Sequence, residues 1–100
     1  MIIPDKVKIA GVFYDIKYKK GLNNGTSLCF GYVDNDKAFI ELEPDIQNAQ
    51  RMKQTLLHEI IHALDFSLGI KLSESAVDKI ANGFYMVLTD NKEMFLGEDE

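Results

Sequence analysis

The sequence has one cysteine, two prolines and no tryptophan among its 100 residues, and it has no long apolar run. The lone Cys29 cannot form an internal disulfide and suits a reducing cytoplasm, where such a residue is usually a small buried hydrophobe. No stretch approaches the roughly 18 consecutive apolar residues of a membrane span. The amino terminus, MIIPDKVKIAG, turns charged at once, unlike a signal peptide. We therefore expect a cytoplasmic protein that does not enter the membrane.

Positive charge is also scarce. The chain carries 11 Lys and Arg against 16 Asp and Glu, which gives a net charge of -5. The cluster Lys17, Lys19 and Lys20 is too small to form a phosphate-binding stripe. We therefore expect no nucleic-acid partner, and the sequence leaves the oligomeric state open.

The composition that is present, 46% hydrophobic and 27% charged, is ordinary for a globular protein, and this length favours one domain over residues 1–100. Alternating segments in residues 1–44 predict three or four strands, separated by the loop GLNNG and the turn DND. The predicted fold class is α+β, with a small antiparallel sheet followed by two packed helices.

Pro44 ends the extended part of the chain, and a first helix is predicted over 45–69, with Asp45 as its N-cap and Gly69 as its stop. A second helix is predicted over 73–91, capped by Ser73 or Ser75. Residues 92–100 are expected to form a frayed acidic tail. Gly83, inside the second helix, would be explained by a close approach to the first helix, with a local kink as the alternative. The core-facing residues of the second helix are expected to be Val77, Ile80, Ala81, Phe84, Val87 and Leu88.

The two histidines of the chain lie four residues apart on the first helix, in TLLHEIIHALD. Thr55, His58, His62 and Asp65 fall on one polar face of an otherwise apolar helix, where a buried polar group needs a partner. Two imidazoles one turn apart can hold one ion, and Glu59 completes HEIIH, the HExxH arrangement of zinc hydrolases. The pattern predicts a metal pair with a carboxylate beside it.

A catalytic zinc site needs a third protein ligand. Asp65 lies about 7.5 Å of helix rise beyond the midpoint of the pair, which is too far for a short side chain, so it is assigned either a supporting role or a polar contact to the neighbouring helix. Glu74 is the better candidate, because a turn at Gly69 can fold the second helix back across the histidines. Asp78, one turn further, stays open as the alternative third ligand.

With these residues the chain resembles the zincin metallopeptidases of the gluzincin branch, in which a Glu on the helix after HExxH is the third zinc ligand. The segment ESAVD, Glu74 to Asp78, repeats the spacing of this Glu and an Asp in thermolysin-like enzymes. The resemblance covers residues 55–91 and is closest to the minimal gluzincin-like proteins of bacteria and their phages, similar to the ImmA/IrrE-type peptidases.

The resemblance implies a zinc metallopeptidase with one zinc ion per chain, bound by His58, His62 and Glu74. Glu59 would act as general base on a zinc-activated water, and Asp78 would orient a ligand histidine. The substrate would be a peptide or protein, paired with an edge strand at Ala38 to Glu43. Thermolysin-like enzymes also use a third histidine to stabilise the oxyanion, which this chain lacks. Tyr32 or Tyr85 is the available substitute.

Two other interpretations remain. Peptide deformylases combine HExxH with a cysteine ligand, and Cys29 is the corresponding residue, although SLCFG lacks the surrounding motif of that family. The second is a catalytically weak or inactive zincin-like module that binds or regulates another protein, with zinc in a structural role. The intact Glu59 favours the enzyme, because a structural site has no use for a general base.

Overall fold

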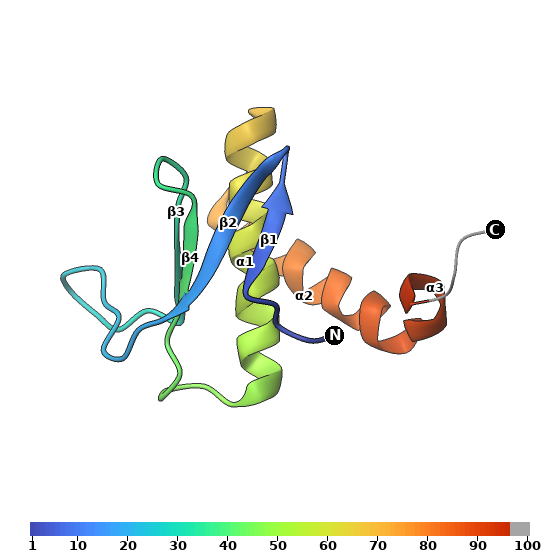
Figure 1. Ribbon diagram of the computed structural model, residues 1–100, viewed down its shortest axis with the longest axis horizontal. Coiled ribbons are helices and arrows are strands. Elements are labelled where there is room, and N and C mark those ends of the chain that lie inside the picture. Colours follow the sequence, from blue (N-terminus) through green and yellow to red (C-terminus); the bar gives the residue numbers. More distant parts are fainter. Residues whose placement is uncertain (97–100) are drawn as a thin grey trace.

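The computed structural model describes residues 1–96, which form a four-stranded sheet followed by helices (Figure 1). The predicted α+β class is confirmed. A short helix occupies part of the segment predicted as a tail, whereas GEDE lies outside the described residues. In chain order the elements are β1 Lys6–Ile9, β2 Val12–Tyr18, β3 Gly31–Asp34, β4 Phe39–Leu42, α1 Ala49–Leu68, α2 Glu74–Asp90 and α3 Lys92–Leu96.

The sheet is mixed, with strand order β1-β2-β4-β3, so the prediction of an antiparallel sheet is wrong. The pairs β1/β2 and β3/β4 are antiparallel, but β2 and β4 are parallel, with Ile16 opposite Ile40. After β2 the chain crosses through residues 19–30 to the far edge and returns in the β3/β4 hairpin. This route places β4 in the middle of the sheet.

The interior position of β4 also overturns the predicted edge strand at Ala38 to Glu43, since the edge strand on this side is β3. Ile40 and Leu42 of β4 are 0% exposed, whereas β3 offers Val33 to the core. The strand with two large apolar side chains on its inner face takes the buried place, because the hydrophobic effect scales with the apolar area removed from water.

Helix α1 begins later than predicted, with Asn48 rather than Asp45 as its N-cap. The buried carboxylate of Glu43 accepts hydrogen bonds from the backbone N–H groups of Asp45 and Ile46, which holds those two residues in a turn outside the helix. The Asn48 side chain then accepts from the N–H of Arg51. The predicted stop at Gly69 is confirmed, with a left-handed φ of 65°.

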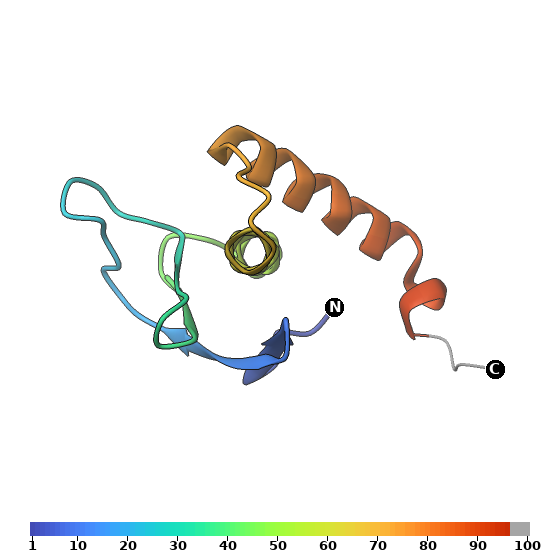
Figure 2. The same cartoon turned by 90° about the horizontal axis from the view of Figure 1, so that it is seen from above.

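Three layers result, because α1 packs on the sheet and α2 packs on the opposite side of α1 (Figure 2). Leu56 and Ala63 of α1 are buried on the sheet side, where they join the main core. The other buried members of that core are Ile9, Tyr14, Ile16, Ile40 and Leu42.

Helix α2 begins at the predicted N-cap Ser73 and runs away from the body of the molecule (Figure 1). Its core-facing stripe was predicted too wide. The buried side chains are Val77, Ala81 and Tyr85, whereas Ile80, Phe84 and Val87 are exposed. Among the described helices and strands, only α1 and α3 contact this helix, so one narrow line of positions four residues apart is covered.

The predicted close approach at Gly83 is also wrong, because an added Cβ there would meet nothing within 4 Å. Neither α2 nor any other helix in residues 1–96 combines the length and the apolar character needed to cross a membrane.

Candidate metal centre

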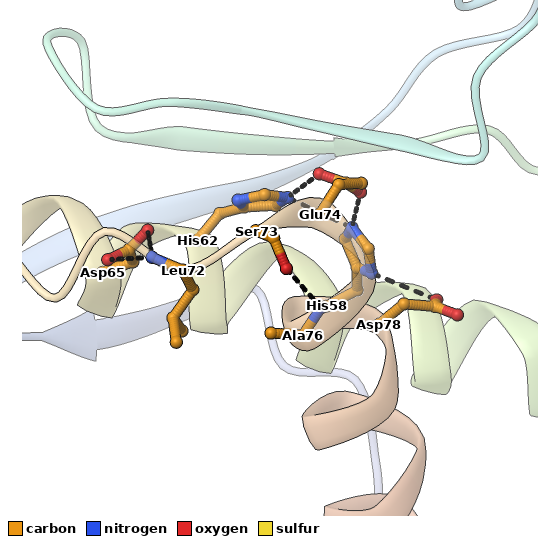
Figure 3. Close-up of polar contacts among 8 residues, drawn as sticks. All are labelled: His58, His62, Asp65, Leu72, Ser73, Glu74, Ala76 and Asp78. Atoms are coloured by element: carbon orange, nitrogen blue, oxygen red, sulfur yellow. Dashed lines mark hydrogen bonds and ion pairs between the residues drawn. The ribbon is translucent and has the colours of Figure 1, made fainter.

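His58 and His62 lie one turn apart on α1 and turn the same ring nitrogen toward each other (Figure 3). Their Nε2 atoms are 3.2 Å apart, and the ring centroids are 4.8 Å apart in an edge-on arrangement. The i, i+4 spacing produces this meeting directly, since such side chains lie above one another on a helix. Both rings are partly buried, which limits their freedom to turn away.

Glu74, the first residue of α2, closes the group from the opposite side (Figure 3). Its Oε1 lies 2.7 Å from Nε2 of His58, and its Oε2 lies 2.9 Å from Nε2 of His62. The side chain is 71% exposed, so it reaches the histidines from the solvent side. Ligand atoms of these three residues all lie within 4.8 Å of one another.

The loop between the helices is fixed by Asp65, near the end of α1. Its Oδ1 accepts a hydrogen bond of 2.6 Å from the backbone N–H of Lys71, and its carboxylate also accepts from Leu72. Ser73 then caps α2 by accepting from the N–H of Ala76. Asp65 therefore does not reach the histidines but holds the loop that delivers Glu74.

Asp78 lies one turn after Glu74 and faces Nδ1 of His58, the ring nitrogen that points away from Glu74 (Figure 3). Its Oδ1 is 3.5 Å from Nδ1 of His58, while Nε2 of that ring faces Glu74. A carboxylate on this side favours the tautomer with a proton on Nδ1, which leaves Nε2 as a lone-pair donor.

The donor set suits a zinc ion. Two imidazole nitrogens and a carboxylate oxygen are ligands that zinc takes, and donors bonded at about 2.0–2.1 Å to a tetrahedral ion lie about 3.3 Å apart. The two imidazole Nε2 atoms are 3.2 Å apart, and the nearest Glu74 oxygen is Oε1 at 2.7 Å for His58 and Oε2 at 2.9 Å for His62, so each of these pairs is within about 0.6 Å of that separation. Because Glu74 is the exposed member, its side chain can make this adjustment.

Glu59 is a separate carboxylate on α1 and is only 7% exposed. Burial, together with the charge of the neighbouring Glu74 carboxylate, raises the pKa of its carboxyl group to about 8. A bound divalent cation would lower this pKa again. A carboxylate in this setting is a stronger base than one in water, which is what proton removal near neutral pH requires.

A cleft of about 310 Å³ joins these residues to the edge of the sheet. Gly31 lies against the α1 wall so closely that an added Cβ would be 2.6 Å from Cγ2 of Thr55 and 3.2 Å from Cγ of Glu59. The lining residues are Cys29, Phe30, Gly31, Arg51, Gln54, Thr55, His58, Glu59, Glu74, Asp78 and Asn82.

Sequence reasoning missed the part of this cleft formed by Arg51 and Phe30. The guanidinium carbon of Arg51 lies 4.4 Å from the centroid of the Phe30 ring. One signal was available, because Arg51 precedes Thr55 by four residues and Glu59 by eight and therefore shares their helix face. Its partner Phe30 comes from a distant loop, which no local pattern indicates.

Both tyrosines considered for oxyanion stabilisation lie away from the cleft lining. Tyr32 points to the outer side of the sheet, with its ring centroid 6.1 Å from that of Phe39, and Tyr85 is buried on α2. The structure therefore does not support either tyrosine as the oxyanion donor.

Cys29 does line the cleft. Among residues 1–96, however, the group able to hold a metal ion comprises His58, His62 and Glu74 without Cys29.

Comparison of the chain with protein-family models, with curated proteins and with solved structures gave no match.

Proposed function

We propose that the protein is a zinc-dependent metallopeptidase, with one zinc ion held by His58, His62 and Glu74 and with Glu59 as general base. The observation that carries the proposal is the position of a buried carboxylate beside a group of possible metal ligands. One ligand atom from each of His58, His62 and Glu74 lies within 4.8 Å of the others, and the buried carboxylate of Glu59 lines a cleft together with two of these residues, His58 and Glu74.

Each residue has a defined task in peptide hydrolysis. When bound, zinc supplies Lewis acidity, which makes water more acidic and a scissile carbonyl more electrophilic. Glu59 accepts the proton of the attacking water and then donates it to the leaving amine, so that one carboxylate serves both steps. Asp78 holds the orientation and the tautomer of His58 through Nδ1.

The number and exposure of the ligands favour a hydrolytic over a structural site. Structural zinc sites are normally closed by four protein ligands, whereas hydrolytic sites use three and leave one position open. Three residues form the group here within the described part of the chain, and it opens to solvent at Glu74. A substrate can therefore approach without unfolding the protein.

The free edge of β3 is the place where an extended peptide substrate could add to the sheet. Residues 29–31 line the cleft, and β3 is paired with β4 on one side only. Backbone pairing at this edge would lay the peptide along the wall opposite Glu59. This strand takes the role first assigned to Ala38 to Glu43.

The second candidate is a binding or regulatory module with zinc in a structural role. The position of the tyrosines favours it, since neither lines the cleft and the expected oxyanion donor is therefore missing. The buried carboxylate of Glu59 favours the enzyme, because such a group is costly to place where it has no chemical task.

The test is the Glu59→Gln variant, assayed with wild type on a pool of synthetic peptides after both are loaded with zinc. We expect the variant to retain zinc and to lose kcat/KM by about 10²–10⁴, as removal of a general base does. Chelation of zinc should abolish wild-type cleavage, and added zinc should restore it.

Equal cleavage by both proteins would remove Glu59 from the mechanism. Zinc binding by both proteins without cleavage by either would favour the binding module instead.

A further inference from the structure

Arg51 is the only arginine of the chain, and it lies on α1 seven residues before His58. Its guanidinium group stacks over the Phe30 ring at 4.4 Å. Stacking of this kind holds a guanidinium plane in place and leaves its N–H donors, which point outward along the plane, available for other partners. Arg51 is therefore an oriented cation rather than a freely moving one.

Both residues of this pair line the same cleft as the proposed catalytic groups. Among the lining residues, Arg51 is the only one with a permanent positive charge, whereas Glu59, Glu74 and Asp78 are acids. Glu74 and Asp78 contact His58, and Glu59 follows it in the sequence, whereas Arg51 lies seven residues earlier on α1.

The charge of Arg51 has no protein partner in residues 1–96. The ion pairs of that part of the chain join His58 and His62 to Glu74 and Asp78. The backbone N–H of Arg51 donates to Asn48, but its guanidinium donates no hydrogen bond among the described residues. A guanidinium group carries five N–H donors in a planar fork, which is suited to a carboxylate and binds it in a bidentate manner.

We infer that Arg51, held by Phe30, forms a subsite that binds a carboxylate of the substrate. This inference depends on the proposed peptidase function and names the class of substrate. The separation of seven positions between Arg51 and His58 corresponds to about 10.5 Å of helix rise. An extended peptide advances about 3.3 Å per residue, so the carboxylate lies about three residues from the scissile bond.

The carboxylate can belong to an Asp or Glu side chain or to the carboxyl terminus of the peptide. The net charge of -5 repels acidic peptides as a whole, so the preference for acid is confined to the one substrate position that meets Arg51. A preference for acidic residues at every position of the peptide could not be explained by Arg51.

The test uses a pool of acetylated peptides with randomised positions, half with free and half with amidated carboxyl termini, cleaved by the zinc-loaded protein and read by mass spectrometry. We expect Asp and Glu to be enriched at one position two to four residues from the cut, or cuts to fall at that distance from free termini. A peptide in which an amide replaces the preferred carboxylate should have a kcat/KM lower by about tenfold or more than the carboxylate peptide, as expected for the loss of a hydrogen-bonded charge.

Three variants separate recognition from a structural role of the stack. Arg51→Gln should reduce the ratio of kcat/KM between acid and amide peptides to about 1, and Arg51→Glu should shift the preference to lysine. Lys53→Gln is the matched control, because it removes the same charge two residues along α1 from a residue outside the cleft lining. A purely structural role would lower kcat/KM for acid and amide peptides alike and leave the ratio unchanged, which would overturn the inference.

A binding experiment separates this inference from the proposed function. The same pool is passed over immobilised zinc-loaded Glu59→Gln protein, with and without Arg51→Gln, and the retained peptides are sequenced. Enrichment of carboxylates that depends on Arg51 supports the subsite even if wild type cleaves nothing, an outcome that would count against the peptidase alone. Cleavage by wild type without any acid preference in either assay would reject the subsite and leave the peptidase standing.

Discussion

Helix α1 is packed on both sides, between the sheet and α2, whereas α2 contacts, of the helices and strands within residues 1–96, only α1 and the short α3. The buried side chains of α2 end at Tyr85, and its carboxyl-terminal part extends away from the body (Figure 1). The candidate metal centre draws on both helices, with two ligands from the well-packed one and one ligand from the other. Packing on two sides therefore fixes α1 and the two histidines that it carries. The position of Glu74 depends instead on the loop between α1 and α2.

The largest effect is expected from Glu74→Ala, which removes the contribution of α2 to the centre. Loss of a supporting residue typically weakens metal affinity by about 10–100-fold, so loss of a ligand should exceed about 100-fold. Competition with a zinc chelator measures this change. Because Glu74 is mostly exposed, the unfolding temperature of the metal-free protein should hardly move. Unchanged zinc affinity would remove Glu74 from the ligand set and make Asp78 the remaining candidate.

A smaller effect on zinc is expected from Asp65→Ala, which leaves all three ligands in place but releases the loop. Backbone N–H groups of Lys71 and Leu72 lose their acceptor, which should lower the free energy of unfolding of the metal-free protein by about 1–3 kcal/mol. We expect zinc affinity to fall by about tenfold, because α2 no longer holds Glu74 in position. Urea unfolding and chelator competition report the two changes separately.

Thr89→Ala is a control for that variant, since the Thr89 hydroxyl donates its hydrogen bond to Met86 within α2, away from the loop. If Asp65→Ala weakens folding but leaves zinc affinity at the control value, the loop does not position Glu74.

The smallest effect is expected from Gly83→Ala, on a side of α2 where no neighbour lies close to the backbone. An added Cβ would meet nothing within 4 Å, and the residue lies inside a helix. The substitution should raise the free energy of unfolding by up to about 1 kcal/mol, since Ala has the higher helix propensity. Thermal unfolding checks this, with zinc affinity expected to stay unchanged. A destabilised variant would mean that the helix bends or packs at Gly83 in solution.

The parts of the site that the sequence predicted are those encoded locally. The meeting of His58 and His62 needs only a helix and a spacing of four residues, and the caps Gly69 and Ser73 follow from residue type. The position of Glu74 was a hypothesis about one loop, and the structure places it beside both histidines.

The features that were missed depend on contacts between distant segments. The sheet was predicted antiparallel because turn residues indicate hairpins but not which strand takes the middle, a choice decided here by the inner faces of β3 and β4. The start of α1 shifted because the buried carboxylate of Glu43 holds Asp45 in a turn. The contact of Arg51 with Phe30 could not be predicted, since it joins a helix to a loop more than twenty residues away.

The central claim is that His58, His62 and Glu74 bind the same zinc ion, and X-ray absorption at the zinc edge tests it most directly. The measurement is made on protein loaded with one zinc per chain. We predict a first shell of nitrogen and oxygen donors with the signal of two imidazoles and no sulfur. A sulfur donor would instead assign Cys29 as a ligand, and a shell with fewer than two imidazoles would contradict the shared site.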